Sequence, residues 1–216
     1  MESLANAVWL TLGLTVLGGY LLGSIPFGLI ATRLGGAGDI RKIGSGNIGA
    51  TNVLRSGRKD LALITLLGDG GKGAVAVLLA RWLTHGSDVV VALAGASAFV
   101  GHLFPIWLKF KGGKGVATFF GVLLAASWPV GVLAGATWLL MAYFLRYSSL
   151  SALAAAAMAP LFAFMTDRPY AIIGLSAFMA VLIFIRHHQN ISRLLKGEEP
   201  KIGAKKAAAA AEPEGK

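Results

Sequence analysis

Polar groups suited to holding an anion gather in one short segment of an otherwise apolar chain, residues 44–55 (GSGNIGATNVLR). The segment carries three glycines, serine and threonine hydroxyls, two asparagine amides and an arginine. Backbone N–H groups freed by glycine, short hydroxyl and amide donors, and a forked guanidinium are groups that bind phosphate oxygens. The spacing matches neither the GxxxxGK(S/T) nucleotide loop nor the GxGxxG dinucleotide motif. These residues predict an anion site whose ligand must be inferred from the rest of the chain.

Two other polar segments offer groups of the same kind, residues 111–118 (KGGKGVAT) and 187–199 (HHQNISRLLKGEE). The glycines at 112, 113 and 115 would free the backbone around Lys114, and the helix expected next would direct its N-terminal N–H groups at the same anion. Taken alone, GGKG is also typical of a flexible basic turn. The same four letters recur at 70–73, which is too little to establish an internal repeat.

The composition favours a membrane protein over a soluble one. Of 216 residues, 56% are hydrophobic and 14% are charged, and the mean hydropathy is +0.69. The net charge of +10 could suggest nucleic acid, but basic residues beside apolar runs more often set membrane topology, so no nucleic-acid partner is expected. There is no cysteine, and no histidine or carboxylate cluster has ligand spacing; we therefore expect no metal and no cofactor.

Seven apolar runs are expected to span a membrane, residues 6–31, 61–83, 89–108, 115–128, 130–145, 150–165 and 170–185. The first carries no charge and is too long for a cleaved signal peptide. With seven spans, nearly all Lys and Arg residues lie on one side and only Arg81 and Arg168 on the other. The positive-inside rule then makes the basic side cytoplasmic, with the N-terminus outside and the C-terminus inside. A five-helix model would keep this orientation.

The expected fold is therefore an all-α membrane protein of about seven transmembrane helices, with its active site in cytoplasmic loops. A single domain is expected over residues 1–200, followed by a disordered low-complexity tail over 201–216.

Several residues interrupt the apolar runs. The stretch 68–73 (GDGGKG) predicts a broken or partly interfacial helix with Asp69 and Lys72 paired inward. Alternatively, residues 61–67 lie in the interface and leave both charges near water. Pro26 is expected to kink the end of the first span. His102 is expected to be a hydrogen-bonded core residue.

Together the motifs identify a resemblance that covers nearly the whole chain up to residue 199. From GSIPFG at 23–28 through the three polar segments, the chain resembles the bacterial acyl-phosphate:glycerol-3-phosphate acyltransferase family, which are integral membrane enzymes. The resemblance implies acyl transfer from acyl phosphate to the 1-hydroxyl of sn-glycerol 3-phosphate. The products would be lysophosphatidic acid and inorganic phosphate, in the first step of bacterial phospholipid synthesis.

The resemblance also implies a location and a set of partners. The chain would be a multi-pass protein of the bacterial cytoplasmic (inner) membrane and a monomer without a cofactor. Its partners would be the two substrates, membrane lipid and enzymes that supply acyl phosphate.

By the same resemblance, four residues are expected to be catalytic: Ser45, Arg55, Lys114 and His187. The expected substrate-binding residues are Gly46, Asn47, Gly49, Thr51, Asn52, Gly112, Gly113, Gly115, Asn190, Arg193 and Glu199. Acyl phosphate would lie on Ser45, Asn47 and the amides around Gly46 and Gly49. Glycerol 3-phosphate would meet Arg55, Lys114, His187 and Asn190. Glu199 would orient the cationic groups, paired with Arg193.

The residues leave several alternatives open. His187 suits a general base by type, but it would equally serve as a binder while the substrate phosphate takes the proton. Ser45 as a covalent nucleophile would need an adjacent base, and no Ser-His-Asp pattern is legible. None of the four histidines is followed four residues later by Asp, which argues against the other large glycerolipid acyltransferase family. A transporter of small anions or phosphate esters is the main alternative function, and only Asp69 and Lys72 favour it.

Overall fold

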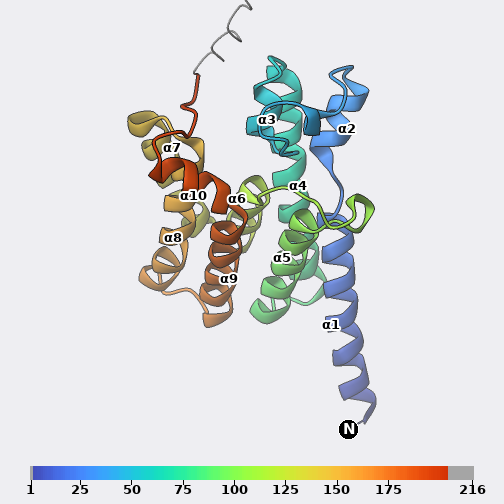
Figure 1. Ribbon diagram of the computed structural model, residues 1–216. Coiled ribbons are helices and arrows are strands. Elements are labelled where there is room, and N and C mark those ends of the chain that lie inside the picture. Colours follow the sequence, from blue (N-terminus) through green and yellow to red (C-terminus); the bar gives the residue numbers. More distant parts are fainter. Residues whose placement is uncertain (1, 204–216) are drawn as a thin grey trace, which may run out of the picture.

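The computed structural model describes residues 2–203, without the side chain of Leu4, and all regular secondary structure in this part of the chain is helical (Figure 1). Residues 204–216 of the expected tail lie outside it. Its α-helices are α1 (Glu2–Gly23), α2 (Phe27–Leu34), α3 (Ala50–Leu54), α4 (Lys59–Leu83), α5 (Asp88–Leu103), α6 (Val116–Ala126), α7 (Trp128–Leu145), α8 (Ser148–Met165), α9 (Tyr170–Arg186) and α10 (His188–Leu195). Two short 3-10 turns, η1 (Ile40–Lys42) and η2 (Ile106–Leu108), lie in the loops.

All seven expected apolar runs are helical, but they differ in length. Five segments of the described chain are long and apolar enough to cross a membrane: residues 5–34, residues 88–108, which contain α5 and η2, and helices α4, α7 and α8. A sixth is reached if α9 and α10, bent by 62° to each other, count as one span. The 11 residues of α6 rise only about 16 Å, against a hydrocarbon core of about 30 Å. Length and composition thus support a multi-pass protein, while the number seven stays a prediction.

The break expected at residues 68–73 does not occur, and that prediction was wrong. Helix α4 runs without interruption from Lys59 to Leu83. Its glycines mark places where neighbours come close: a Cβ on Gly73 would lie 2.9 Å from the Thr118 backbone oxygen. Small residues let membrane helices approach in this way without breaking them. The inward pairing of Asp69 with Lys72 is confirmed, because their side chains are 1% exposed and 2.7 Å apart.

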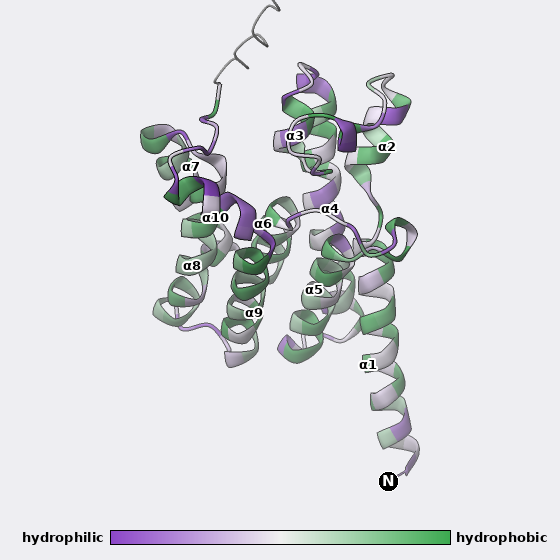
Figure 2. Ribbon diagram, in the orientation of Figure 1, coloured by the Kyte–Doolittle hydropathy of each residue, from purple (hydrophilic) through white to green (hydrophobic). Residues whose placement is uncertain are grey.

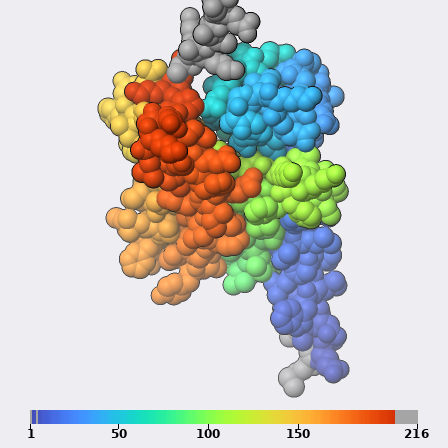
Figure 3. All heavy atoms as spheres, in the orientation of Figure 1, coloured from blue at the N-terminus to red at the C-terminus, as the bar shows by residue number. Residues whose placement is uncertain are grey.

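Pro26 separates α1 from α2, as expected, since α1 ends at Gly23 and α2 begins at Phe27. The two helices have different main partners. Helix α1 packs along α5, and its first turns project beyond the other helices (Figure 3). Helix α2 packs on α4 and carries the chain toward η1. The proline thus lets one apolar run serve two packing surfaces.

The buried apolar residues form one large core and a small second one. The large core contains residues from each of the helices α4, α5, α6, α7, α8 and α9, among them Phe99, Phe119 and Met179. The second core lies under the 35–58 segment and consists of Leu29, Ile40, Ile48, Val53, Leu61 and Ala62. Hydrophilic residues gather at the end of the bundle where α2, α3 and α10 lie, whereas the opposite ends of α8 and α9 are mostly hydrophobic (Figure 2). The small core therefore seats the first polar segment at the polar end of the molecule.

Candidate active site

The first polar segment, residues 44–55, is folded around the side chain of Asn52, which is 1% exposed. Its Nδ2 donates to the carbonyls of Ile40, Ile43 and Asn47 at 3.1, 3.0 and 2.8 Å. Its Oδ1 accepts from the backbone N–H of Ser45 at 3.0 Å and from the Ser45 hydroxyl at 3.3 Å. Both ends of the amide are therefore occupied. Asn52 holds the loop together and does not have a donor free for substrate, contrary to our expectation.

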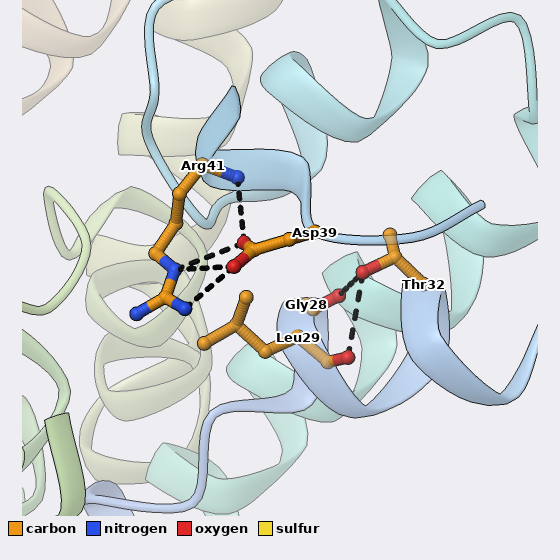
Figure 4. Close-up of polar contacts among 5 residues, drawn as sticks. All are labelled: Gly28, Leu29, Thr32, Asp39 and Arg41. Carbon is orange, nitrogen blue, oxygen red and sulfur yellow. Dashed lines mark hydrogen bonds and ion pairs between the residues drawn. The ribbon is translucent and has the colours of Figure 1, made fainter. Parts of the chain in front are cut away.

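The approach to this loop is fixed by a turn at Asp39. The Asp39 carboxylate accepts from the Arg41 backbone N–H at 3.0 Å and from the Arg41 guanidinium at 2.6 Å, while nearby Thr32 bonds back to the carbonyl of Gly28 at 2.8 Å (Figure 4). Beyond it, Gly46 has a φ of +70°, which side chains rarely adopt. The Gly46 N–H donates to the Ile43 carbonyl at 3.0 Å, so this amide too is used within the loop.

The second segment, GGKG, is clamped between the ends of two helices. The N–H groups of Gly112 and Gly113 donate to the carbonyls of Leu103 and His102, at the end of α5, at 3.1 and 3.2 Å. From the other side, Arg186 at the end of α9 donates to both glycine carbonyls, at 2.9 and 3.1 Å. These glycines therefore do not offer their amides to a phosphate, which corrects the expected role of Gly112 and Gly113.

Gly115 differs from those two glycines. It has a φ of +87°, precedes the first residue of α6 and lines the cavity described below. Like every helix, α6 has N–H groups in its first turn that find no acceptor within the helix. Lys114 and the start of α6 thus face the same space, as the sequence predicted.

The third segment holds Lys114 through a chain of hydrogen bonds. The Lys114 ammonium donates to Asn190 Oδ1, and Asn190 Nδ2 donates to Glu199 Oε1 at 2.6 Å. Glu199 also accepts from Ser149 on α8 and Arg193 on α10, both at 2.7 Å. Burial opposes ionisation of Glu199, but the hydrogen bonds from Ser149, Asn190 and Arg193 lower its pKa overall. The expected Arg193–Glu199 pair is confirmed.

Burial also acts on Lys114 itself. Burial, together with the neighbouring cation Arg193, lowers the pKa of Lys114 to about 8, against the opposing effect of Glu199. A phosphate beside Lys114 would supply the negative charge that this cation otherwise lacks.

His187 lies beyond the last residue of α9, where the chain bends into α10, and it is 3% exposed. Its Nδ1 lies 2.8 Å from the carbonyl of Ile183. A carbonyl only accepts, so Nδ1 carries the proton and Nε2 is left as an acceptor. Burial lowers the pKa of His187 to about 4, so the ring is neutral at pH 7 and a weak base.

A cavity of about 750 Å³ brings the three segments together. Eleven of the expected site residues line it: Ser45, Asn47, Gly49, Thr51, Asn52, Arg55, Lys114, Gly115, His187, Asn190 and Glu199. The other four, Gly46, Gly112, Gly113 and Arg193, do not line it. Most of the remaining lining is apolar and comes largely from α4, α6 and α7, including Leu66, Phe120, Leu124, Val132 and Leu139. The cavity thus combines the polar residues of the three segments with an apolar wall.

Several cavity or support residues were not predicted for the site. Ser148 and Ser149 enter from α8, and Asp69 and His102 from α4 and α5. Arg186 holds the GGKG loop from behind. None of these residues lies in the three polar segments, which they meet only in the folded protein. For Asp69 alone, the sequence contained a hint of a special role, because a charge lies inside an apolar run. Within residues 2–203, no group of three or more His, Cys, Asp or Glu side chains is placed to hold a metal ion.

Comparison with known proteins gives one consistent result. The family model described as glycerol-3-phosphate acyltransferase matches residues 13–197. A curated protein of that name from Caulobacter vibrioides (strain NA1000 / CB15N) is 74% identical over 213 residues, which cover 99% of this chain and 98% of the relative. One from Rhodospirillum rubrum is 60% identical over 206 residues, with 93% and 95% covered.

Two solved structures have the same fold. Both are crystal structures of an integral membrane glycerol 3-phosphate acyltransferase, one in its glycerol 3-phosphate form and one in its lysophosphatidic acid form. The first has a TM-score of 0.84 and is 38% identical in sequence. The match covers 89% of this chain and 96% of the solved chain. The second has a TM-score of 0.83 at the same identity, with 89% and 95% covered.

Proposed function

This chain belongs to the glycerol-3-phosphate acyltransferase family, and on that premise we propose that it acylates the 1-hydroxyl of sn-glycerol 3-phosphate, with acyl phosphate as donor. The products are lysophosphatidic acid and inorganic phosphate. The observation that carries this proposal is the mixed lining of the cavity, because its polar residues suit two phosphates and its apolar residues suit an acyl chain.

The donor is assigned to the side of the cavity formed by residues 44–55. Ser45 and Asn47 line this side, and Gly49 is the N-cap of the short helix α3 beside them. Asn52 fixes their positions from behind. The acyl chain would lie along the apolar wall between α4, α6 and α7, where burying each methylene is worth about 0.8 kcal/mol.

The acceptor is assigned to the facing cations. Among the described residues, the Arg55 guanidinium has no hydrogen bond or ion pair, and it lines the same cavity as Lys114 and His187. A guanidinium and an ammonium are the usual partners of a phosphate monoester. Glycerol 3-phosphate would therefore be held by Arg55 and Lys114, with Asn190, Glu199 and Arg193 orienting Lys114.

The chemical step needs positioning and charge stabilisation more than a strong base. The 1-hydroxyl oxygen attacks the acyl carbonyl carbon, the bond from that carbon to the phosphate oxygen breaks, and phosphate leaves. His187 Nε2 would accept a hydrogen bond from the hydroxyl and aim it. Because the pKa of His187 is about 4, the proton is better taken by the departing phosphate. Lys114 and the start of α6 would stabilise the developing negative charge.

A covalent route through Ser45 has less support. The Ser45 hydroxyl contacts the carbonyl oxygen of the Asn52 amide at 3.3 Å, and an amide is not a base. His187 has no carboxylate against its Nδ1, which instead bonds to a backbone carbonyl. A Ser-His-Asp arrangement would require both.

The same proposal includes a membrane setting. Most basic residues of the described chain lie at the polar end of the bundle, which the positive-inside rule assigns to the cytoplasm, with the N-terminus outside. The enzyme would be a monomer of the bacterial inner membrane, formed by one domain over residues 1–200. It would contact membrane lipid and take acyl phosphate from the same leaflet. Other enzymes would make this acyl phosphate.

The test is direct turnover. Purified protein in detergent or liposomes is given palmitoyl phosphate and glycerol 3-phosphate, and the expected result is release of phosphate together with one lysophosphatidic acid per phosphate. Phosphate release without lysolipid would indicate hydrolysis, and no turnover by folded protein would end the proposal. Uptake of radiolabelled glycerol 3-phosphate into liposomes without acylation would favour the transporter instead.

A further inference from the structure

A buried cluster of three ionisable side chains, two of which line the cavity, has no part in the proposed chemistry. Asp69 and Lys72 come from α4 and His102 from the end of α5, and they are 1%, 4% and 4% exposed. Lys72 Nζ donates to Asp69 Oδ1 at 2.7 Å, and His102 Nδ1 lies 3.5 Å from the same oxygen. Charged groups inside apolar helices are costly and are usually retained for a function.

The cluster is linked to the break between α1 and α2. Lys72 Nζ also donates to the carbonyl of Ile25 at 2.7 Å. This carbonyl lies just before Pro26, where the helix stops, so Lys72 satisfies an acceptor that an unbroken helix would have satisfied itself. The lysine therefore has two partners, and it holds the Asp69 carboxylate in one place.

The other side of the cluster touches the GGKG loop. The His102 ring packs so closely on Gly113 that a Cβ at this position would overlap its Nε2. The His102 backbone carbonyl accepts from the Gly113 N–H at 3.2 Å. The residue after Gly113 is Lys114, so the position of the His102 ring limits where the loop can place Lys114.

Asp69 reaches the start of α6 as well. Its backbone carbonyl accepts from the Thr118 hydroxyl at 2.9 Å, and Gly121 of α6 packs directly against the backbone of Gly70. This turn of α4 thus contacts helix α6, which follows Lys114, while His102 beside Asp69 contacts the glycine loop that precedes Lys114.

We propose that Asp69, Lys72 and His102 are positioning residues, which seat the GGKG loop so that Lys114 faces the acceptor phosphate. This inference rests on the proposed function, because it assigns Lys114 to glycerol 3-phosphate. It gives Asp69 and Lys72 a role that requires no transport through the membrane.

The inference is tested with His102→Ala and with the double variant Asp69→Asn/Lys72→Gln. The double variant removes both charges together, because loss of one partner would leave an unpaired buried charge. We expect KM for glycerol 3-phosphate to rise between about 10- and 100-fold, as for a catalytic group misplaced by about 1 Å, while KM for palmitoyl phosphate is unchanged. Thr65→Val is the matched control, since Thr65 is buried on the same helix and bonds only to Leu61.

Gly113→Ala adds a readout that general destabilisation would not produce. The new methyl group would strike the His102 ring, so Gly113→Ala alone should raise KM for glycerol 3-phosphate. Once His102→Ala has removed the ring, adding Gly113→Ala should have little further effect. Non-additivity of this kind is expected of residues that act through one contact.

The outcomes separate the two proposals. If the wild-type protein does not acylate glycerol 3-phosphate, the proposed function fails. If it does, but the cluster variants keep a normal KM for glycerol 3-phosphate or raise both KM values equally, the positioning role is overturned. Fully additive effects of Gly113→Ala and His102→Ala would overturn it as well.

Discussion

Asn190 donates a 2.6 Å hydrogen bond from its side-chain amide to Glu199 Oε1. A carboxylate only accepts, so this bond fixes the amide with its NH₂ toward Glu199 and its oxygen toward Lys114. Glu199 is itself held by Ser149 and Arg193. A carboxylate that has no chemical role in the proposed reaction therefore decides how the cation at the acceptor site is presented.

Glu199→Ala should lower both stability and acceptor affinity. The change leaves the donors of Ser149, Asn190 and Arg193 without their shared acceptor, and each unsatisfied buried donor costs about 1–3 kcal/mol. We expect a lower midpoint of thermal unfolding in detergent and a higher KM for glycerol 3-phosphate. Glu199→Gln keeps one acceptor oxygen and should be milder. An unchanged unfolding midpoint for Glu199→Ala would show that the network does not stabilise the fold.

Binding of glycerol 3-phosphate should weaken on the alkaline side. Burial lowers the pKa of Lys114 to about 8, so this side chain is charged below that pH and neutral above it. KM for glycerol 3-phosphate should therefore rise as pH increases through about 8, while the phosphate monoester, with a second pKa of about 6, stays dianionic.

The control for this pH profile is Lys114→Arg. A guanidinium keeps its charge to above about pH 12, so the alkaline rise in KM should disappear even if the variant is slower. A profile with the same alkaline limb in Lys114→Arg would assign the limb to another group.

Asn52→Asp should impair the protein as much as Asn52→Ala. Aspartate keeps the oxygens that face Ser45 but replaces the NH₂ group that donates to three carbonyls. A carboxylate oxygen facing those carbonyls is repelled, so the 44–55 loop should lose its fold. Turnover with palmitoyl phosphate measures this effect, and near-normal activity of Asn52→Asp would contradict the role of Asn52 as the centre of the loop.

Arg186 should be replaceable by neither lysine nor glutamine. Its guanidinium donates to two successive carbonyls, of Gly112 and Gly113, and lies over the Phe104 ring at 5.5 Å from the centroid. Lysine keeps the charge without the fork. We expect Arg186→Lys and Arg186→Gln to raise KM for glycerol 3-phosphate similarly. Full activity of Arg186→Lys would mean that charge alone matters there.

Arg55→Ala and Ser45→Ala should separate the two substrates. Hydrogen bonds to charged groups are worth about 1.5–3 kcal/mol, so Arg55→Ala should raise KM for glycerol 3-phosphate by roughly 10- to 100-fold. Ser45→Ala should instead lower turnover with little effect on that KM. Wild-type kinetics in both variants would show that the first polar segment is not the site.

Local residue patterns were sufficient for the class of protein and for the three polar segments, which meet at one cavity. The length of an apolar run and the chemistry of a polar segment are properties of neighbouring residues, so the helices and the three segments were predicted from sequence. Sequence also placed Lys114 before a helix and paired Asp69 with Lys72, because an unpaired charge in an apolar run would be too costly.

Only the tertiary structure decided which polar groups are free and which are used. Gly112 and Gly113 resemble Gly115 in sequence, but their amides bond to the end of α5. Arg186 acts on Gly113 from 73 positions away, and Ser149 acts on Glu199 from 50. Asn52 resembles a phosphate ligand, yet its amide is consumed by its own loop. Hydrogen-bond partners depend on which helices meet, and the spacing of residues along one segment does not contain that information.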